Sequence, residues 1–241
     1  MEYYSELKYV EKLIVNVGVF LKKQKIKRAV SLKGRDIKLE LDRQAELKIT
    51  ESLLREFEYP ILGEEFGFSE SFENDKLYWI VDPIDGTMNY SRNIQLCCIS
   101  IALWNGKEPI LGVIYDFYNG KLYSGLDGYG ARLNGEELIY NKIANKNQGI
   151  LATGFPVSLE FSKVKTHDLF AFYKDYKKIR MFGSAAISLA FLAEGKVDAY
   201  FEENIKIWDV AAGIAIANSI NIPFKIEFFN HNNTITKAGL Y

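Results

Sequence analysis

The chain has 241 residues, of which 48% are hydrophobic and 25% are charged, so it is long enough for one or two compact domains with a sizeable core. Lysine and arginine number 30 against 31 aspartates and glutamates, which leaves a net charge of −1. This balance argues against a nucleic-acid-binding protein that acts through a bulk positive field. A small anionic substrate stays compatible with it, because local charge decides such binding.

The cysteines and histidines exclude further classes of protein. Cys97 and Cys98 are the only cysteines and are adjacent, so no disulfide framework can form, which fits a reducing compartment. We expect them to pack in the core, or one on each side of a strand. The two histidines, His167 and His231, are too few for a His/Cys zinc site, and we expect His167 at the surface.

The hydropathy pattern predicts a soluble, cytoplasmic protein. The first six residues are polar and acidic and do not resemble a signal peptide. The longest charge-free runs, such as residues 210–224, fall short of the roughly 18–20 apolar residues that a membrane span needs. We therefore expect no membrane partner.

Two amphipathic helices are predicted near the start of the chain. The first has an apolar stripe at steps of three and four, formed by Leu7, Val10, Ile14, Val17 and Leu21. The second is expected over about residues 42–57, with one face formed by Ala45, Ile49, Leu53 and Phe57. Between them, the basic stretch 22–35 is expected to be a surface loop or hairpin.

Strand patterns dominate the next part of the chain. Apolar runs rich in β-forming residues occupy residues 77–81, 97–104, 109–115 and 121–124. Asn-Gly pairs at 105–106, 119–120 and 134–135 predict tight turns. This region is therefore expected to be an antiparallel meander.

The second half alternates between strands and helices. Strands are expected near residues 150–152 and 197–201, and helices near 161–176, 184–193 and 209–218. We therefore predict a layered α/β fold in two lobes: an N-terminal α+β lobe over residues 1–135 and a C-terminal α/β lobe over residues 136–241.

The most informative segment is 79–87, where a strand of the buried type runs into two acids, Asp82 and Asp85, and then Gly86-Thr87. We expect the strand to end at the acids, with the intervening proline fixing a turn. The glycine lets backbone approach a ligand, and the threonine can cap a following helix whose free N–H groups suit an anion. The segment thus offers cation ligands and a phosphate cradle. In isolation, however, such a motif is more often a polar turn with a helix cap.

Two further acidic segments strengthen the functional interpretation. Glu64 and Glu65 follow the apolar residues 60–62, at another strand end. Asp209 stands at the start of a very apolar helix. Each has a simple alternative, because the glutamates can be a solvated loop and the aspartate can be a helix cap worth about 1 kcal/mol.

Four segments in order carry a resemblance to a known family. They are Gly63-Glu64-Glu65, Asp82-Pro83-Ile84-Asp85-Gly86-Thr87, Gly183-Ser184-Ala185-Ala186 and Trp208-Asp209-Val210-Ala211-Ala212-Gly213. With them the sequence resembles the inositol monophosphatase family, which groups with the fructose-1,6-bisphosphatases and the bisphosphate nucleotidases. The resemblance extends from the first helix to about residue 217. It implies a layered αβαβα sandwich with the active site between the lobes, and a homodimer by analogy.

The resemblance implies a metal centre. The implied ligands of a first ion are Glu64, Asp82 and the backbone carbonyl of Ile84. Those of a second ion are Asp82, Asp85 and Asp209, with Asp82 bridging, and Glu64 would help to hold a weaker third ion through water. Carboxylates gathered in this way repel one another unless cations neutralise them. Ligation by oxygen alone selects Mg²⁺ first, with Mn²⁺ as a possible substitute.

The resemblance also implies catalytic and substrate-binding residues. Thr87 with Asp42 would position and activate the attacking water, with Glu65 as a supporting neighbour. The implied substrate contacts are Gly86, Thr87, Gly183, Ser184, Ala185 and Glu202. A role for Lys33 is no better supported than its interpretation as a plain surface lysine.

Three functions remain to be separated. The first is a Mg²⁺-dependent phosphomonoesterase acting on a small polyol phosphate, with inositol 1-phosphate as the lead and fructose-1,6-bisphosphatase or histidinol-phosphate phosphatase as relatives within the family. The second is a 3′(2′),5′-bisphosphate nucleotidase, for which we find no base-binding shelf. The third is a non-catalytic relative that binds metal or a partner, and the intact pair Asp42 and Thr87 argues against it.

Overall fold

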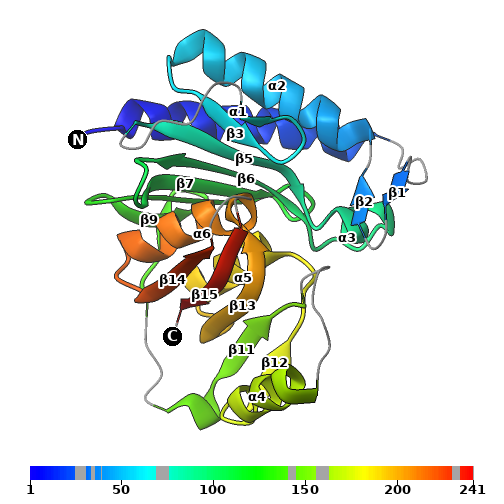
Figure 1. Cartoon of the computed structure of the whole chain (residues 1–241). Helices are drawn as coiled ribbons and strands as arrows, with labels where there is room; N and C mark the ends of the chain where they lie inside the picture. Colours follow the sequence, from blue (N-terminus) through cyan, green and yellow to red (C-terminus); the bar gives the residue numbers. More distant parts are fainter. Residues whose placement is uncertain are drawn as a thin grey trace.

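The structure is a computed structural model that describes residues 1–24, 31–33, 36–38, 40–68, 76–140, 145–155, 163–229 and 234–240. Its elements lie in successive layers, in the order helices, sheet, helices, sheet and helix (Figure 1). This arrangement confirms the predicted layered α/β fold of the αβαβα type.

The outer helix layer contains α1 (Tyr4–Lys23) and α2 (Glu40–Glu56). All five residues of the predicted stripe on α1 are buried. On α2 the buried face includes Ala45, Ile49 and Leu53 as predicted, whereas Phe57 lies just beyond the helix end and is half-buried. Burial of these stripes against the sheet holds the helices in place, since packing of an amphipathic face stabilises helices more than propensity does.

A hairpin of β1 (Ser31–Lys33) and β2 (Asp36–Lys38) connects the two helices. The antiparallel pairing of these two strands agrees with the expected hairpin. The side chain of Lys33 lies outside the described part of the chain.

An eight-stranded sheet follows, in the order β10-β9-β8-β7-β6-β5-β3-β4. Its strands are β3 (Ile61–Gly63), β4 (Gly67–Phe68), β5 (Tyr78–Asp85), β6 (Cys98–Trp104), β7 (Pro109–Asp116), β8 (Lys121–Leu126), β9 (Gly130–Leu133) and β10 (Glu136–Glu137). From β5 to β10 each strand pairs antiparallel with the next, which confirms the meander. At the turn between β9 and β10, Asn134 and Gly135 both have positive φ, at 51° and 89°, the conformation for which Asn-Gly is suited.

Cys97 and Cys98 are both fully buried, one in each of two core clusters. Cys97 packs with residues of α1 and α2, and Cys98 packs with residues of the inner helices. Successive residues of an extended chain point to opposite faces of a sheet. The two cysteines therefore pack in the core on opposite faces of the eight-stranded sheet, as predicted.

The middle layer contains α5 (Ala185–Ala193) and α6 (Ile207–Ser219), both apolar and buried on nearly all sides. The helix α6 approaches the eight-stranded sheet so closely that a β-carbon on Gly112 of β7 would collide with the backbone of Ala212. A glycine there lets α6 lie directly against the sheet, and α6 carries Asp209.

Gly112→Ala is expected to destabilise the protein, because the added methyl group meets backbone that cannot move independently. Overpacking of this kind costs about 1–3 kcal/mol, which for a chain of this length lowers Tm by roughly 2–4 °C per kcal/mol. Thermal unfolding of the purified variant measures it. A Tm equal to that of the wild type would contradict this packing of α6.

A five-stranded sheet lies beyond these helices, in the order β12-β11-β13-β15-β14. Its strands are β11 (Ile150–Thr153), β12 (Lys178–Arg180), β13 (Ala199–Lys206), β14 (Phe224–Phe229) and β15 (Thr234–Leu240). A short 3-10 helix, η1 (Lys146–Gln148), precedes it. The strand β13 is longer than predicted, because it continues to Lys206 and leads directly into α6.

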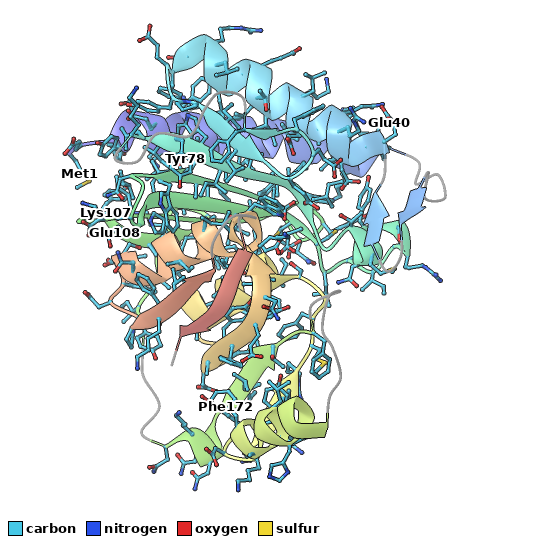
Figure 2. All side chains as sticks on the ribbon, viewed as in Figure 1. Met1, Glu40, Tyr78, Lys107, Glu108 and Phe172 are labelled. Atoms are coloured by element: carbon cyan, nitrogen blue, oxygen red, sulfur yellow. The ribbon has the colours of Figure 1, made fainter. Side chains whose placement is uncertain are left out.

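The last layer is α4 (Lys163–Tyr173), packed on the outer side of the five-stranded sheet. Phe172, labelled in Figure 2, packs against Phe201 of β13 with ring centroids 4.8 Å apart. His167 on this helix is exposed, as predicted, and His231 lies outside the described residues.

The connection between the two sheets bears on the predicted lobes. The eight-stranded sheet extends to Glu137, and the five-stranded sheet begins with Ile150. Lys121 of β8 lies 2.8 Å from the Glu194 carboxylate at the end of α5, so an ion pair joins the first sheet to the inner helix layer. The lobe boundary between residues 135 and 136 stays a prediction.

None of the described helices has the length and apolar character to cross a membrane.

Candidate metal centre and active site

The strand β5 carries both acids of the most informative segment. The sequence predicted a strand that ends at the two acids with a turn at Pro83 between them, but Pro83 lies within β5, which continues through Asp85. Its pairing with β6 is irregular there, because Asp82 lies opposite Ser100 and Asp85 opposite Cys98. Three steps on β5 thus face two on β6, which is the geometry of a β-bulge. In a regular strand residues three apart point to opposite faces, so this irregularity allows both acids to face α6.

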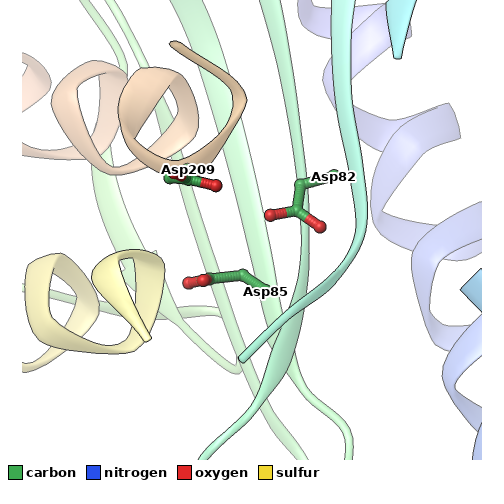
Figure 3. Close-up of side chains that lie close together, drawn as sticks. All are labelled: Asp82, Asp85 and Asp209. Carbon is green, nitrogen blue, oxygen red and sulfur yellow. The ribbon is translucent and has the colours of Figure 1, made fainter. Parts of the chain in front are cut away.

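Asp209 completes a cluster of three carboxylates. The helix α6 begins at Ile207, two residues earlier than predicted, so Asp209 lies in its first turn. One carboxylate oxygen each of Asp82, Asp85 and Asp209 lies within 4.8 Å of the others. Figure 3 shows the three side chains converging from β5 and α6 on the same space. Asp209 Oδ2 also accepts a hydrogen bond from the Lys206 backbone N–H at 3.2 Å, so the predicted capping contact coexists with membership of the cluster.

Asp82 is the least satisfied member of this cluster. Its side chain is 1% exposed, and Oδ1 accepts a hydrogen bond from the Ile84 N–H at 3.0 Å. Oδ2 is buried and has no hydrogen-bond partner within the described part of the chain. Burial, together with the charges of Glu64, Asp85 and Asp209, raises the pKa of Asp82 well above its usual value. A buried carboxylate oxygen without a partner is costly, and a cation between the three acids would satisfy it.

Asp85 is held in place from the N-terminus of α5. Its Oδ2 accepts hydrogen bonds at 2.6 Å from the Ser184 hydroxyl and from the Ala186 N–H. Burial raises the pKa of Asp85 to about 6, and these hydrogen bonds partly offset that rise. Ser184 also accepts a bond from the Ile187 N–H as the N-cap of α5. Two predicted elements, the acidic strand and the Gly-Ser-Ala-Ala turn, are therefore brought into direct contact.

The rest of that turn lies beside the segment that follows β5. Gly183 is exposed and has a φ of 73°, and its position faces the Asn89 side chain. The Asn89 amide donates hydrogen bonds to the carbonyls of Leu96 and Phe182. Ala185 is buried at the start of α5. Contacts of this turn with a substrate stay a prediction.

Glu64 lies at the end of β3, as the sequence predicted. It is half-buried, and its backbone N–H donates to the Val81 carbonyl of β5 at 3.2 Å. Its charge contributes to the raised pKa values of both Asp82 and Asp209. Glu64 therefore belongs to the electrostatic environment of the cluster, although its side chain is not one of the three that converge within 4.8 Å.

Thr87 and Asp42 are brought together from distant parts of the chain. Asp42 lies in the first turn of α2 and is 3% exposed. The Thr87 hydroxyl lies 3.2 Å from Asp42 Oδ1 and 2.9 Å from the Ile84 carbonyl oxygen. The expectation that Thr87 caps a helix is wrong. Gly86, with a φ of 88°, is the N-cap of the five-residue helix α3 (Thr87–Ser91), and the Thr87 side chain is used in these other contacts.

Glu202 occupies a buried position on β13. It is 8% exposed, and its Oε2 accepts a hydrogen bond from the Tyr200 hydroxyl at 3.0 Å. Burial raises the pKa of Glu202 to about 7, with a smaller contribution from the charge of Asp85. In return, Glu202 contributes to the raised pKa of Asp209. The predicted substrate contact is thus electrostatically coupled to the acidic cluster.

Sequence reasoning missed one buried acid near the site, Glu46 on α2. It follows Asp42 by four residues, so both lie on one face of the helix. A glutamate inside the apolar stripe of Ala45 and Ile49 was the signal that could have drawn attention to it. Glu65, predicted as a supporting residue, donates its backbone N–H to Glu46 at 2.8 Å.

Comparison with known proteins decides the family. The model of the inositol monophosphatase family matches residues 6–221 of this chain. The chain belongs to the inositol monophosphatase family. The predicted resemblance is confirmed, and it covers most of the chain.

Individual members of the inositol monophosphatase family are similar in sequence and in structure. The chain is 39% identical over 188 residues to "Nus factor SuhB" of Xylella fastidiosa, covering 75% of this chain and 66% of that protein. It is 36% identical over 192 residues to "Inositol-1-monophosphatase" of a Synechocystis species, covering 76% and 65%. The chain thus spans just under two thirds of the length of these two relatives. The crystal structure of the suhB protein of Bartonella henselae superposes with a TM-score of 0.83 at 29% identity, over 98% of this chain and 93% of that chain.

Proposed function

We propose that this member of the inositol monophosphatase family is a Mg²⁺-dependent phosphomonoesterase that releases phosphate from a small polyol phosphate, with inositol 1-phosphate as the lead substrate. The observation that carries the proposal is the buried Oδ2 of Asp82, which lies among the carboxylates of Asp85 and Asp209 and has no hydrogen-bond partner among the described residues. A family relative named inositol-1-monophosphatase supports the choice of substrate.

The donor set suits hard divalent cations. A first ion would be held by Glu64, Asp82 and the Ile84 carbonyl, and a second by Asp82, Asp85 and Asp209. All of these donors are oxygen atoms, which favours Mg²⁺ over softer metals, with Mn²⁺ as a substitute and room for a third, weaker ion. When bound, such ions neutralise the phosphate, lower the pKa of the attacking water and stabilise the leaving oxygen.

The protein's own side chains would handle the proton of the attacking water. Thr87 Oγ1 lies within hydrogen-bond reach of Asp42 Oδ1. A water bonded to the Thr87 hydroxyl can pass it a proton as the hydroxyl gives its own to Asp42, so water becomes the nucleophile without a covalent enzyme intermediate. Glu65 would support this arrangement from the turn after β3.

Substrate orientation would come from both sides of the cluster. The backbone at Gly86 and Thr87 and the turn of Gly183, Ser184 and Ala185 would line the phosphate. The Glu202 carboxylate would accept a hydrogen bond from a substrate hydroxyl.

By analogy with the family we further propose a cytoplasmic homodimer, with the site between lobes over residues 1–135 and 136–241.

A panel of phosphate esters tests the proposed reaction and its branch. Phosphate release would be measured at saturating Mg²⁺ for inositol 1-phosphate, fructose 1,6-bisphosphate, adenosine 3′,5′-bisphosphate and histidinol phosphate. A strong preference for inositol 1-phosphate would support the proposal. A preference for adenosine 3′,5′-bisphosphate would move the assignment to the nucleotidase branch.

Glu202→Gln is expected to change substrate preference more than general phosphatase activity. The substitution keeps the size of this buried side chain but removes the charge that accepts the substrate hydroxyl. We expect kcat/KM for inositol 1-phosphate to fall about 10–100-fold, or about 1.4–2.7 kcal/mol. A phosphate ester without a neighbouring hydroxyl, such as phenyl phosphate, serves as the control and should be hydrolysed at nearly the wild-type rate. Equal losses on both substrates would refute this role.

The names of several relatives keep one alternative open. The Xylella and Escherichia coli relatives are named Nus factor SuhB, and this name does not describe a phosphatase. The alternative is therefore a non-catalytic protein that binds metal or a partner. If this chain bound Mg²⁺ but released phosphate from none of the four esters, the non-catalytic alternative would replace the proposal.

A further inference from the structure

Glu46 is a buried acid that the proposed reaction does not use. It lies on α2, one turn after Asp42, and is 1% exposed. Glutamate is almost never fully buried unless it is paired. A charge or hydrogen-bonding role must therefore offset the cost of removing this carboxyl group from water.

Both oxygens of Glu46 accept hydrogen bonds from the turn that follows β3. Oε2 accepts from the Glu65 N–H at 2.8 Å, and Oε1 accepts from the Phe66 N–H at 3.0 Å. The same carboxylate lies so close to Gly63 that a β-carbon at that position would overlap it. The turn is thus wrapped around the Glu46 side chain, and the glycine at its start makes room for the carboxylate.

Glu64 is the residue enclosed by these contacts. On its N-terminal side, β3 pairs with β5 and the Glu64 N–H donates to the Val81 carbonyl. On its C-terminal side, the next two amides are held by Glu46. The backbone of Glu64 is therefore fixed from both directions, and from this backbone the Glu64 charge acts on Asp82 and Asp209, whose pKa values it raises.

A second contact from α2 reaches the same turn. The Arg43 guanidinium lies over the Phe66 ring, 5.2 Å from its centroid. Because Asp42 is on the same helix, α2 holds the proposed water-activating carboxylate and the turn that presents Glu64 in one rigid unit.

We propose that Glu46 is a positioning residue that sets the affinity of the metal centre by fixing Glu64. The proposal rests on the proposed metal-dependent function. Glu46 is not among the proposed metal ligands or substrate contacts, and it acts through the two amides after Glu64. Outer-shell partners of this kind typically contribute 10–100-fold to metal affinity.

Glu46→Gln is the variant that separates this role from simple packing. The amide has the same shape, but only its oxygen can accept a hydrogen bond. Its NH₂ group would face one of the two N–H donors, so one bond is replaced by a contact between donors. Glu51→Gln is the matched control, because Glu51 lies on the exposed face of the same helix.

Calorimetric titration of Mg²⁺ into the metal-free proteins measures the effect without relying on activity. We expect Glu46→Gln to bind Mg²⁺ 10–100-fold more weakly than the wild type, and Glu51→Gln to bind as the wild type does. At Mg²⁺ concentrations that saturate the variant, its KM for the phosphate ester should return to the wild-type value.

A double-mutant cycle with Glu64→Gln tests whether Glu46 acts through Glu64. In the Glu64→Gln background, Glu46→Gln should weaken Mg²⁺ binding by less than threefold, since the residue that it positions no longer provides its charge. An undiminished loss in that background would contradict the proposal. So would wild-type Mg²⁺ affinity in a folded Glu46→Gln protein.

Two further outcomes are distinguishable. Absence of Mg²⁺ binding by the wild type would overturn the proposed metal-dependent function itself, whatever the variants do. If Glu46→Gln does not fold, Glu46→Asp replaces it, because aspartate keeps the charge but is one methylene shorter. Weaker Mg²⁺ binding by at least threefold would then support the positioning role, and unchanged binding would overturn it.

Discussion

Asp82→Asn is expected to reduce phosphate release by more than about a thousandfold, or about 4 kcal/mol, without loss of stability in the metal-free protein. Asparagine replaces the carboxylate that would bridge two ions with a neutral amide. It also relieves the repulsion that Glu64, Asp85 and Asp209 exert on a buried carboxylate. The metal-free variant should therefore have a Tm equal to or higher than that of the wild type, while the increase in Tm on adding Mg²⁺ should largely disappear.

Asp116→Asn provides a matched control for this variant. Asp116 is also a buried acid of the eight-stranded sheet, at 1% exposure, but it accepts hydrogen bonds from the Asn119 backbone and side chain. Its substitution should lower Tm while the response to Mg²⁺ and the catalytic rate are preserved. Near wild-type activity in Asp82→Asn would contradict the two-metal arrangement.

The stabilisation that Mg²⁺ provides is expected to increase with pH. In the metal-free protein the pKa of Asp85 is raised to about 6, and those of Asp82 and Asp209 are raised well above their usual value. The folded state therefore binds more protons than the unfolded state, in which these groups titrate near pH 4. The free energy of unfolding contributed by these acids falls as the pH rises from about 4 through 6 and beyond.

Mg²⁺ reverses this dependence because it binds the deprotonated carboxylates. Its affinity should rise by about tenfold per pH unit for each proton that it displaces. The difference in Tm between Mg²⁺-loaded and chelator-treated protein should therefore widen between pH 5.5 and pH 8. The Asp82→Asn protein serves as the control and should show little widening. A difference in wild-type Tm that is constant over this range would contradict the assignment of these acids as ligands.

The helices and the meander were predictable because local patterns decide them. The stripe from Leu7 to Leu21 can be buried only by a helix of that orientation, and the Asn-Gly turn at 134–135 suits only a tight hairpin. The end of β5 was not predictable in this way. Whether Asp82 and Asp85 face the same side depends on how β6 pairs with them, which is a tertiary property.

The candidate site was predictable in composition and less so in geometry. The order of the acidic motifs indicated Glu64, Asp82, Asp85 and Asp209 through the family resemblance. Sequence spacing gave no reason to expect that Ser184 would hold Asp85. The place of Glu46 in the apolar stripe of α2 was a signal that it is buried, but residue type could not reveal its partners, because they are backbone N–H groups.

Phosphate release from inositol 1-phosphate, measured before and after Mg²⁺ is added to chelator-treated protein, tests the central claim most directly. The account predicts no release before the addition, rapid release after it, and none from Asp82→Asn under either condition. Release that is independent of Mg²⁺, or that persists in Asp82→Asn, would contradict it.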